Sequence, residues 1–197
     1  EAVALLDAAV DQFAGATLPH KGIWGRITRE LVGDVTDKEL DKLTDEQKGA
    51  NCRIGGLVLV NAMIFHDILS THYPRVTPLA EIASRNNFDA FASEWQYILD
   101  EVNYYSIFYL ARHVWSSLNF TAWGVPEAVN SMVDTAVKIS AKRAALRHDL
   151  MGRVYHRLLA EAKYLGTYYT SIPAATLLLK LTLHPSGFSI NWSDSER

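Results

Sequence analysis

Residues 54–69 read IGGLVLVNAMIFHDIL and are apolar on nearly every side when wound as a helix. The helical pattern runs from residue 45 to about 73, and a helix that is apolar all round belongs in the centre of a core. Gly55 and Gly56 weaken such a helix by about 1 kcal/mol each relative to alanine, so we expect them to permit close packing. The continuous apolar run, 54–65, is too short to span a bilayer. This stretch therefore predicts the central helix of a folded core.

Helical spacing of apolar residues recurs along most of the chain. The predicted helices cover residues 2–13, 78–85, 88–99, 102–118, 126–145, 147–164 and 172–183, and the two that meet near 146 form one bent helix or two. Thr36 and Thr44 are predicted N-caps, because a hydroxyl there accepts a free backbone N–H. The sequence contains no series of strands that would build a sheet. The predicted fold class is all-α, a multi-helix bundle.

The segment that follows the first helix is predicted to be irregular. Gly15 is expected to end that helix, and Pro19, Gly22 and Gly25 interrupt the pattern after it. Residues 24 and 27, a tryptophan and an isoleucine, are then expected to anchor a loop or a short strand.

Composition limits the class of protein. Of the 197 residues, 49% are hydrophobic and 21% are charged, which indicates about one globular domain rather than a disordered segment. The net charge of -3 means that any nucleic-acid surface is a local patch. The single cysteine, Cys52, excludes an internal disulfide and a cysteine-rich zinc site and fits a reducing compartment. The first ten residues carry acids where a secretory signal has basic residues. We expect a soluble, cytoplasmic protein that does not attach to membranes.

Basic residues gather in the stretch 138–163, whose acids are Asp149 and Glu161. Several of the basic residues are four apart and share a helix face. Such a ridge suits the phosphate backbone of double-stranded DNA, because each phosphate that is neutralised releases counterions. A solvated face or an interdomain contact is the alternative. The candidate DNA-binding residues are Lys138, Lys142, Arg143, Arg147, Arg153 and Arg157.

His66 and Asp67 form the dipeptide that is typical of metal-dependent HD phosphohydrolases, and residues 148–149 repeat it. That chemistry needs an upstream His and a downstream Asp that converge on the pair to hold a metal and activate water. His20 and Asp100 are the candidates, but their spacing does not bring them together. A partly buried, hydrogen-bonded histidine is the simpler interpretation, so no metal site is predicted.

Aromatic residues are dense between 95 and 115. They are Trp95, Tyr97, Tyr104, Tyr105, Phe108, Tyr109 and Trp115. Such a cluster can form a stacking platform for nucleobases. Tyr97, Tyr104, Phe108 and Trp115 fall at helical spacings, however, which favours core packing between two helices with tyrosine hydroxyls at the rim.

The segment 149–183 reads DLMGRVYHRLLAEAKYLGTYYTSIPAATLLLKLTL. It resembles the entry to the catalytic domain of N6-adenine DNA methyltransferases of restriction-modification systems, both type I modification subunits and fused type II enzymes. Their pattern is a helix close to D-x-x-G-x-x-Y-x-x-L-L, then K-x-x-G-x-[FY]-[YF]-T-P, then an apolar helix. The matching residues are Asp149, Gly152, Tyr155, Leu158, Leu159, Lys163, Gly166, Tyr168, Tyr169 and Thr170. Ser171 departs from the usual proline, and Pro173 comes two positions later.

The resemblance implies a role for the loop that closes over S-adenosylmethionine. The implied cofactor-binding residues are Gly166, Thr167, Tyr168, Tyr169 and Thr170, of which Thr167 to Thr170 contact the methionine end. Gly166 permits a backbone turn and Ser171 can cap the next helix. The N-terminus of that helix suits a carboxylate. The alternative is an aromatic-rich capping turn with no ligand.

In that family, a strand and a Gly-rich loop for the adenosine moiety follow, and later an Asn-Pro-Pro-Tyr-type tetrapeptide that holds the flipped adenine. This sequence has no Pro-Pro pair, begins at Glu1 rather than Met, and stops at Arg197, about where the first strand would start. The resemblance therefore implies a helical N-terminal domain, 1–147, and the start of a methyltransferase domain, 148–197. We expect the parent to be a site-specific adenine DNA methyltransferase, and this fragment to be inactive by itself.

The partners implied are double-stranded DNA and a specificity or restriction subunit. Two alternatives stay open. One is a non-catalytic helical interaction module that binds a specificity subunit or its own copy through exposed aromatic residues. The other is the metal phosphohydrolase built on His66 and Asp67.

Overall fold

The computed structural model describes residues 2–84, 88–102 and 104–142. The chain divides into two compact units, Glu1–Val154 and Tyr155–Arg197, and every described residue belongs to the first. The predicted domain boundary between residues 147 and 148 therefore lies outside the described residues. The same holds for the basic residues beyond Lys142 and for the predicted cofactor loop.

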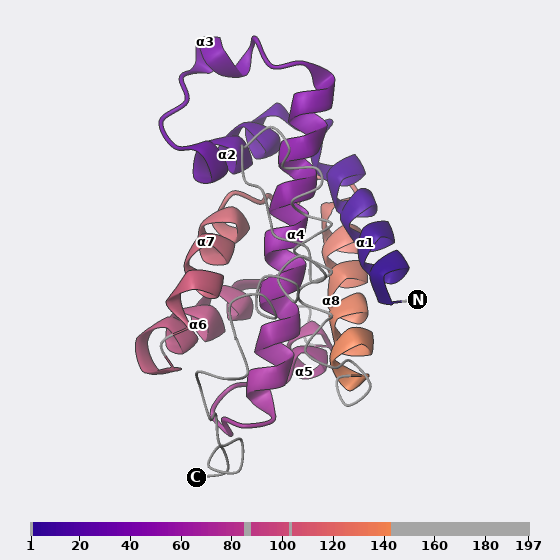
Figure 1. Ribbon diagram of the computed structural model, residues 1–197, viewed down its shortest axis with the longest axis vertical. Helices are drawn as coiled ribbons and strands as arrows, with labels where there is room; N and C mark the ends of the chain where they lie inside the picture. The colour runs from indigo at the N-terminus through magenta and orange to yellow at the C-terminus, as the bar shows by residue number, and fades with distance from the viewer. Residues whose placement is uncertain (1, 85–87, 103, 143–197) are drawn as a thin grey trace, which may run out of the picture. The chain divides into compact units, whose positions relative to one another are not determined.

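The described residues form eight α-helices and one π-helical turn (Figure 1). In order they are α1 (Ala2–Thr17), α2 (Lys21–Val32), α3 (Asp37–Leu40), α4 (Asp45–Ser70), α5 (Leu79–Ser84), α6 (Phe88–Tyr97), η1 (Ile98–Val102), α7 (Tyr105–Ser116) and α8 (Val125–Ala141). No strand occurs in this part of the chain. The all-α class is confirmed.

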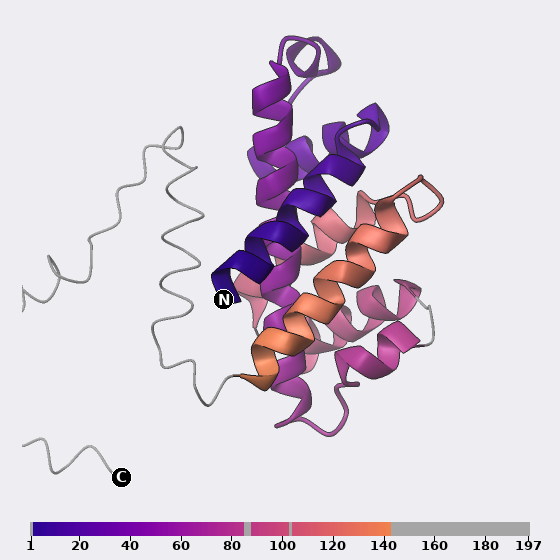
Figure 2. The ribbon, with the colours of Figure 1, turned by 90° about the vertical axis from the view of Figure 1, so that its right-hand side faces the viewer.

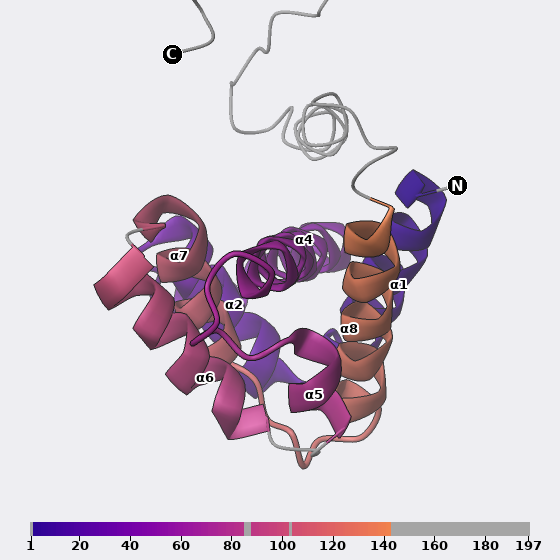
Figure 3. The same cartoon turned by 90° about the horizontal axis from the view of Figure 1, so that it is seen from below.

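Helix α4 runs through the middle of the bundle, as its apolar sequence predicts. Helices α1 and α8 pack against each other and against one flank of α4, which Figures 1 and 2 show from two sides. Helices α2 and α7 contact α4 on the other flank (Figure 3). The buried residues of α4 include Leu59, Val60 and Met63, each with no exposed surface. The core therefore surrounds α4.

The glycine pair of α4 marks the closest approach between helices. A Cβ atom on Gly56 would lie 2.9 Å from Phe13 Cδ1 of α1. A Cβ atom on Gly55 would lie 2.8 Å from Ile27 Cγ2 of α2. Both distances are below normal carbon contact, so only glycine lets α1 and α2 come this near to α4 on its two flanks. The expected role of the pair in close packing is confirmed.

Helix α4 is also long and apolar enough to cross a membrane, by length and composition alone. The apolar run 54–65 in the sequence did not indicate this, because His66 and Asp67 end the run but not the helix, which continues to Ser70. In the fold, however, 67% of the most apolar window of α4 is buried inside the protein. That burial fits the central helix of a soluble protein.

The prediction of a loop or short strand around Trp24 and Ile27 is wrong, because α2 covers these residues. Ile23, Trp24 and Ile27 lie on the buried face of α2, so burial outweighs the cost of the two glycines. Pro19 precedes the N-cap, where it breaks no helical hydrogen bond.

The prediction that Gly15 ends the first helix is also wrong. Helix α1 continues to Thr17, whose side chain is buried and whose Oγ1 donates to the Phe13 carbonyl oxygen (2.9 Å). Gly15 lies on an exposed side of the helix. Its position costs about 1 kcal/mol relative to alanine, and the buried residues on either side outweigh that cost.

The predicted caps at Thr36 and Thr44 are confirmed. The Gln47 N–H donates to Thr44 Oγ1 (3.2 Å), and the Thr44 N–H donates to Gln47 Oε1 (2.9 Å). This reciprocal pair satisfies two N–H groups that the first turn of α4 leaves unbonded. Thr36 makes the corresponding bond through its N–H to Glu39 Oε2 (2.8 Å) at α3. Pro126 lies in the first turn of α8, as its sequence position predicts.

The aromatic cluster divides into a buried part and an exposed part. Trp95, Phe108 and Trp115 are buried between α6 and α7, with the Trp95 and Trp115 ring centroids 5.4 Å apart. Tyr104, at the N-cap of α7, and Tyr105 and Tyr109 of α7 stay exposed. The expected core packing with tyrosines at its rim is confirmed.

The glycine pair gives a direct test of this packing. Gly56→Ala is expected to lower the free energy of unfolding by about 1–3 kcal/mol, because its Cβ forces Phe13 or α1 to move. Gly49→Ala is the matched control in the same helix, where a Cβ meets nothing within 4 Å. It is expected to raise the stability by up to about 1 kcal/mol. Urea unfolding measures both, and equal stability of the two variants would contradict the close contact.

Candidate functional site

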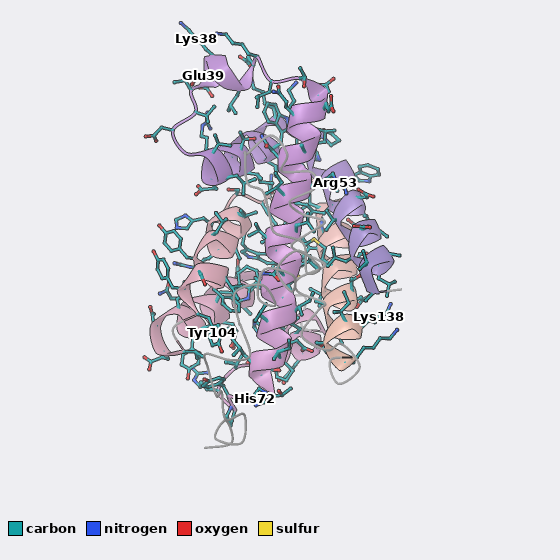
Figure 4. All side chains as sticks on the ribbon, viewed as in Figure 1. Lys38, Glu39, Arg53, His72, Tyr104 and Lys138 are labelled. Atoms are coloured by element: carbon teal, nitrogen blue, oxygen red, sulfur yellow. The ribbon has the colours of Figure 1, made fainter. Side chains whose placement is uncertain are left out.

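The predicted DNA-binding ridge begins on the last turns of α8. Helix α8 buries Val129, Met132 and Ile139 against the core, and Lys138 lies on its exposed face. Figure 4 shows the Lys138 side chain extending away from the bundle. Lys142 follows four residues later, is also exposed, and caps the helix. The described residues thus place the first two members of the ridge at the exposed end of α8.

The rest of the predicted site lies outside the described residues. This applies to Arg143, Arg147, Arg153 and Arg157 of the ridge and to the cofactor loop, Gly166, Thr167, Tyr168, Tyr169 and Thr170.

A hydrogen bond fixes that starting point to the central helix. Ser140, on the last turn of α8, donates its hydroxyl to the Asp67 carboxylate on α4. The other oxygen of Asp67 accepts the Leu79 N–H at the start of α5 (3.4 Å). One carboxylate thus joins three helices. It holds the end of α8 in place.

Next to Asp67, a second set of bonds fixes the chain between α4 and α5. The Thr77 N–H and hydroxyl both donate to the Glu94 carboxylate of α6, at 3.2 Å and 2.7 Å. The Thr77 carbonyl oxygen lies 2.7 Å from Nε2 of His66. All three polar groups of Thr77 are therefore bonded to neighbouring helices, and this loop is a fixed part of the site.

His66 is neutral and fully bonded. Trp95 Nε1 lies 3.1 Å from His66 Nδ1, and an indole N–H is only a donor, so Nδ1 accepts. Nε2 then carries the proton and donates to the Thr77 carbonyl oxygen. Burial lowers the pKa of His66 below its usual value, because the charged ring would lose its hydration. The Thr77 bond and the nearby carboxylates of Glu94 and Asp67 offset only part of this effect.

These bonds bear on the metal-hydrolase interpretation. Neither ring nitrogen of His66 has a free lone pair for a metal, and the carboxylate of Asp67 accepts Ser140 and Leu79. His20 caps α2 and approaches the Trp123 carbonyl oxygen (3.4 Å), while Asp100 accepts Gln96 Nε2 (2.7 Å). In the described part of the chain, no three His, Cys, Asp or Glu residues come together as a metal site would require. The dipeptide has a structural role here.

Cys52 offers no reactive thiol. It is fully buried near Ala14, Trp24 and Leu40. Burial raises the pKa of the Cys52 thiol, and a hydrogen bond with Thr17 opposes that effect. Since a thiolate is the nucleophilic form, Cys52 acts as a small apolar core residue.

Sequence reasoning selected His66 and Asp67 but missed their partners. Thr77, Leu79, Trp95 and Ser140 lie outside α4, and Ser140 is 73 residues from Asp67. The signal in the sequence was a pair of polar residues near the end of an apolar helix. That signal indicates that polar partners are needed, because buried polar groups are hydrogen-bonded, without identifying them.

We compared the chain with known protein families, curated proteins and solved structures. No family model, curated protein or solved structure matches this chain.

The buried histidine predicts a pH dependence of stability. In the unfolded chain His66 gains a proton near pH 6.5, whereas the folded protein resists it because the folded pKa is lower. Below pH 6.5 the unfolded state binds more protons, so the free energy of unfolding falls as the pH falls, by up to about 1.4 kcal/mol per pH unit. Urea unfolding at pH 7.0, 6.0 and 5.5 measures the slope.

Two variants test whether His66 causes this pH dependence of the free energy of unfolding. His66→Asn is expected to be less stable at pH 7 and to lose the His66 part of the slope, whereas His72→Asn, at an exposed turn, is expected to keep it. NMR of the imidazole protons gives an independent reading. A folded-state pKa of His66 that is not below the usual 6.5 would contradict the buried, bonded state.

Proposed function

We propose that this chain is the N-terminal helical region of an S-adenosylmethionine-dependent DNA methyltransferase that acts on adenine N6 in a restriction-modification system. The observation that carries the proposal is the ordered match of residues 149–183 to the entry of that family's catalytic domain. The match follows a helical unit, which is the arrangement that the resemblance implies. Methyl transfer itself belongs to the part of the parent enzyme that holds the Gly-rich loop and the tetrapeptide.

In this enzyme the basic ridge contacts the phosphate backbone. Lys138 and Lys142 extend from the exposed end of α8, and Arg143, Arg147, Arg153 and Arg157 continue the ridge in the sequence. The bond between Ser140 and Asp67 supports this role, because it fixes the helix end from which the ridge starts. Contacts to phosphates position the protein on the duplex and do not read its sequence.

Residues Gly166 to Thr170 close over the cofactor in the intact enzyme. S-adenosylmethionine supplies the methyl group as an activated sulfonium. The Thr167 and Thr170 hydroxyls offer hydrogen bonds to its methionine end, and Gly166 gives the backbone room to turn. The enzyme works in the cytoplasm, where the DNA and the cofactor are found and where the buried thiol of Cys52 stays reduced.

DNA binding tests the ridge. Lys138→Glu with Lys142→Glu, and separately Arg143→Glu with Arg147→Glu, are expected to weaken duplex binding at least tenfold. They should also reduce the slope of log K against log salt by about one for each phosphate that is no longer neutralised. Fluorescence anisotropy of a labelled duplex at several salt concentrations measures both quantities.

Lys38→Glu with Lys42→Glu is the control for the first pair. These lysines are also exposed and four residues apart, and α3 lies at the opposite end of α4 from α5 (Figures 1 and 4). The control makes the same change in net charge. If it weakens binding as much as the variants on the ridge, the effect is one of overall charge and the ridge has no specific role.

Methyl transfer by the product of the whole gene tests the enzyme assignment. Labelled S-adenosylmethionine is expected to transfer its methyl group to adenine N6 of duplex DNA. Tyr169→Ala is expected to lower cofactor affinity at least tenfold, about 1.4 kcal/mol, because it removes an aromatic ring from the cofactor loop. Tyr73→Ala, at a half-exposed tyrosine in the turn after α4, is the control. No label in DNA, together with a gene that lacks the Gly-rich loop and the tetrapeptide, would reduce the segment 166–171 to a capping turn.

A further inference from the structure

One face of α4 carries apolar side chains that no described helix covers. Ile54, Val58, Asn61, Phe65 and Ile68 follow one another at intervals of three and four residues, so they share one face of the helix. All five are half-buried, whereas the other residues of the range 55–64 are buried. Figure 3 shows α1 and α8 on one flank of α4, α2 and α7 on the other, and no described helix on the remaining side. We call these five residues the α4 stripe.

The composition of the α4 stripe is that of a covered surface. Four of its residues are aliphatic or aromatic, and no charged residue lies between positions 54 and 66. A helix at the surface of a soluble protein usually has polar residues on its outer side. The fifth residue, Asn61, has a buried Oδ1 without a hydrogen-bond partner in the described part of the chain. Buried acceptors without a partner are rare, so the described helices do not complete this face.

The chain leaves α8 beside the C-terminal end of the α4 stripe. The bond from Ser140 to Asp67 fixes the last turn of α8 against α4, and Asp67 directly precedes Ile68. The described residues end at Lys142, and the chain up to Val154 belongs to the same compact unit. Four extended residues, 143–146, span about 13 Å, and packed helices lie about 8–10 Å apart. A helix that begins after this linker therefore reaches the open side of α4.

The sequence after this linker has an apolar side that fits the stripe. Residues 147–154 read RHDLMGRV and begin the helix that the sequence predicts over 147–164. In a helix, Leu150, Met151 and Val154 share one face, and Arg153 lies on another. Arg147 comes one turn before this apolar face, where its long side chain extends into solvent. The segment thus combines an apolar face with a basic one.

We propose that the C-terminal half of the α4 stripe, from Asn61 to Ile68, is the docking surface for residues 147–154 of the same chain. The apolar face of the segment covers Phe65 and Ile68, and the segment runs back along α4. This contact directs Arg153 away from the bundle. The inference rests on the open face of α4 and on the sequence that follows α8, so it does not depend on the proposed methyltransferase activity.

Thiol labelling of the full chain with a maleimide tests the proposal. Phe65→Cys places a thiol within the contact, and the natural thiol of Cys52 is fully buried. Leu150→Asp with Val154→Asp is expected to undock the segment, because two carboxylates would otherwise be buried against apolar side chains. The labelling rate of the introduced thiol is then expected to rise at least about tenfold, because the segment no longer protects it.

His148→Asp with Gly152→Asp is the matched control. It also adds two aspartates four residues apart, but on another face of the predicted helix, and is expected to change the rate less than about twofold. An unchanged labelling rate in the variant at Leu150 and Val154 overturns the proposal. A rate that falls as the protein concentration rises also overturns it, because a second copy of the chain would then cover the stripe.

The natural cysteine reports whether each variant keeps its fold. Mass spectrometry shows which thiol is labelled, and Cys52 stays unlabelled as long as the core around it is intact. If the two aspartates unfold the bundle, Leu150→Ala with Val154→Ala makes the same test. It is expected to raise the labelling rate of the introduced thiol at least about threefold, and an unchanged rate overturns the proposal.

Discussion

The bundle depends on the absence of side chains at two consecutive positions of α4. Gly56 brings Phe13 of α1 against the α4 backbone on one flank, and Gly55 brings Ile27 of α2 and Val114 of α7 against it on the other. A helix that is packed this closely on both flanks cannot shift along its axis without separating three neighbours. The glycines cost helix stability by about 1 kcal/mol each, which the burial of the large side chains around them offsets. The close approach of α1, α2 and α7 to α4 follows from these contacts.

Hydrogen bonds near the C-terminal end of α4 set the position of neighbouring elements along the helix axis, which apolar contacts alone do not set. Apolar contacts are non-directional, so the burial of α8 against α4 sets its distance better than its register along the axis. The bond from Ser140 to Asp67 is directional and sets that register. His66, neutral between the Trp95 indole and the Thr77 carbonyl, does the same for the loop before α5. Since an unpaired buried polar group is costly, any shift of these elements would lose more than the bonds themselves.

Features of this fold that depend on residues close in the sequence could be predicted, and features that depend on distant residues could not. Helix α4 was predictable because its apolar residues lie on all sides, and the cap at Thr44 because its partner, Gln47, is three residues away. Helix α2 was missed because Gly22 and Gly25 act locally, whereas the burial of Trp24 and Ile27 that outweighs them comes from distant elements. The partners of His66 and Asp67 were missed for the same reason, since they are 11 to 73 residues away. A polar residue in an apolar helix indicates that a partner exists, but only the fold identifies it.

The fold also separates charges that the net value of -3 conceals. Four acids and one arginine lie in the segment of α6, η1 and α7, whereas Lys138 and Lys142 stand at the end of α8. Helix α4 lies between α7 and α8 (Figure 3). Within a Debye length, about 8 Å at physiological salt, an acid weakens the attraction of a lysine for a phosphate. Because the two lysines and this acidic segment lie on different flanks of α4, the proposed phosphate contact at the end of α8 is kept apart from these acids.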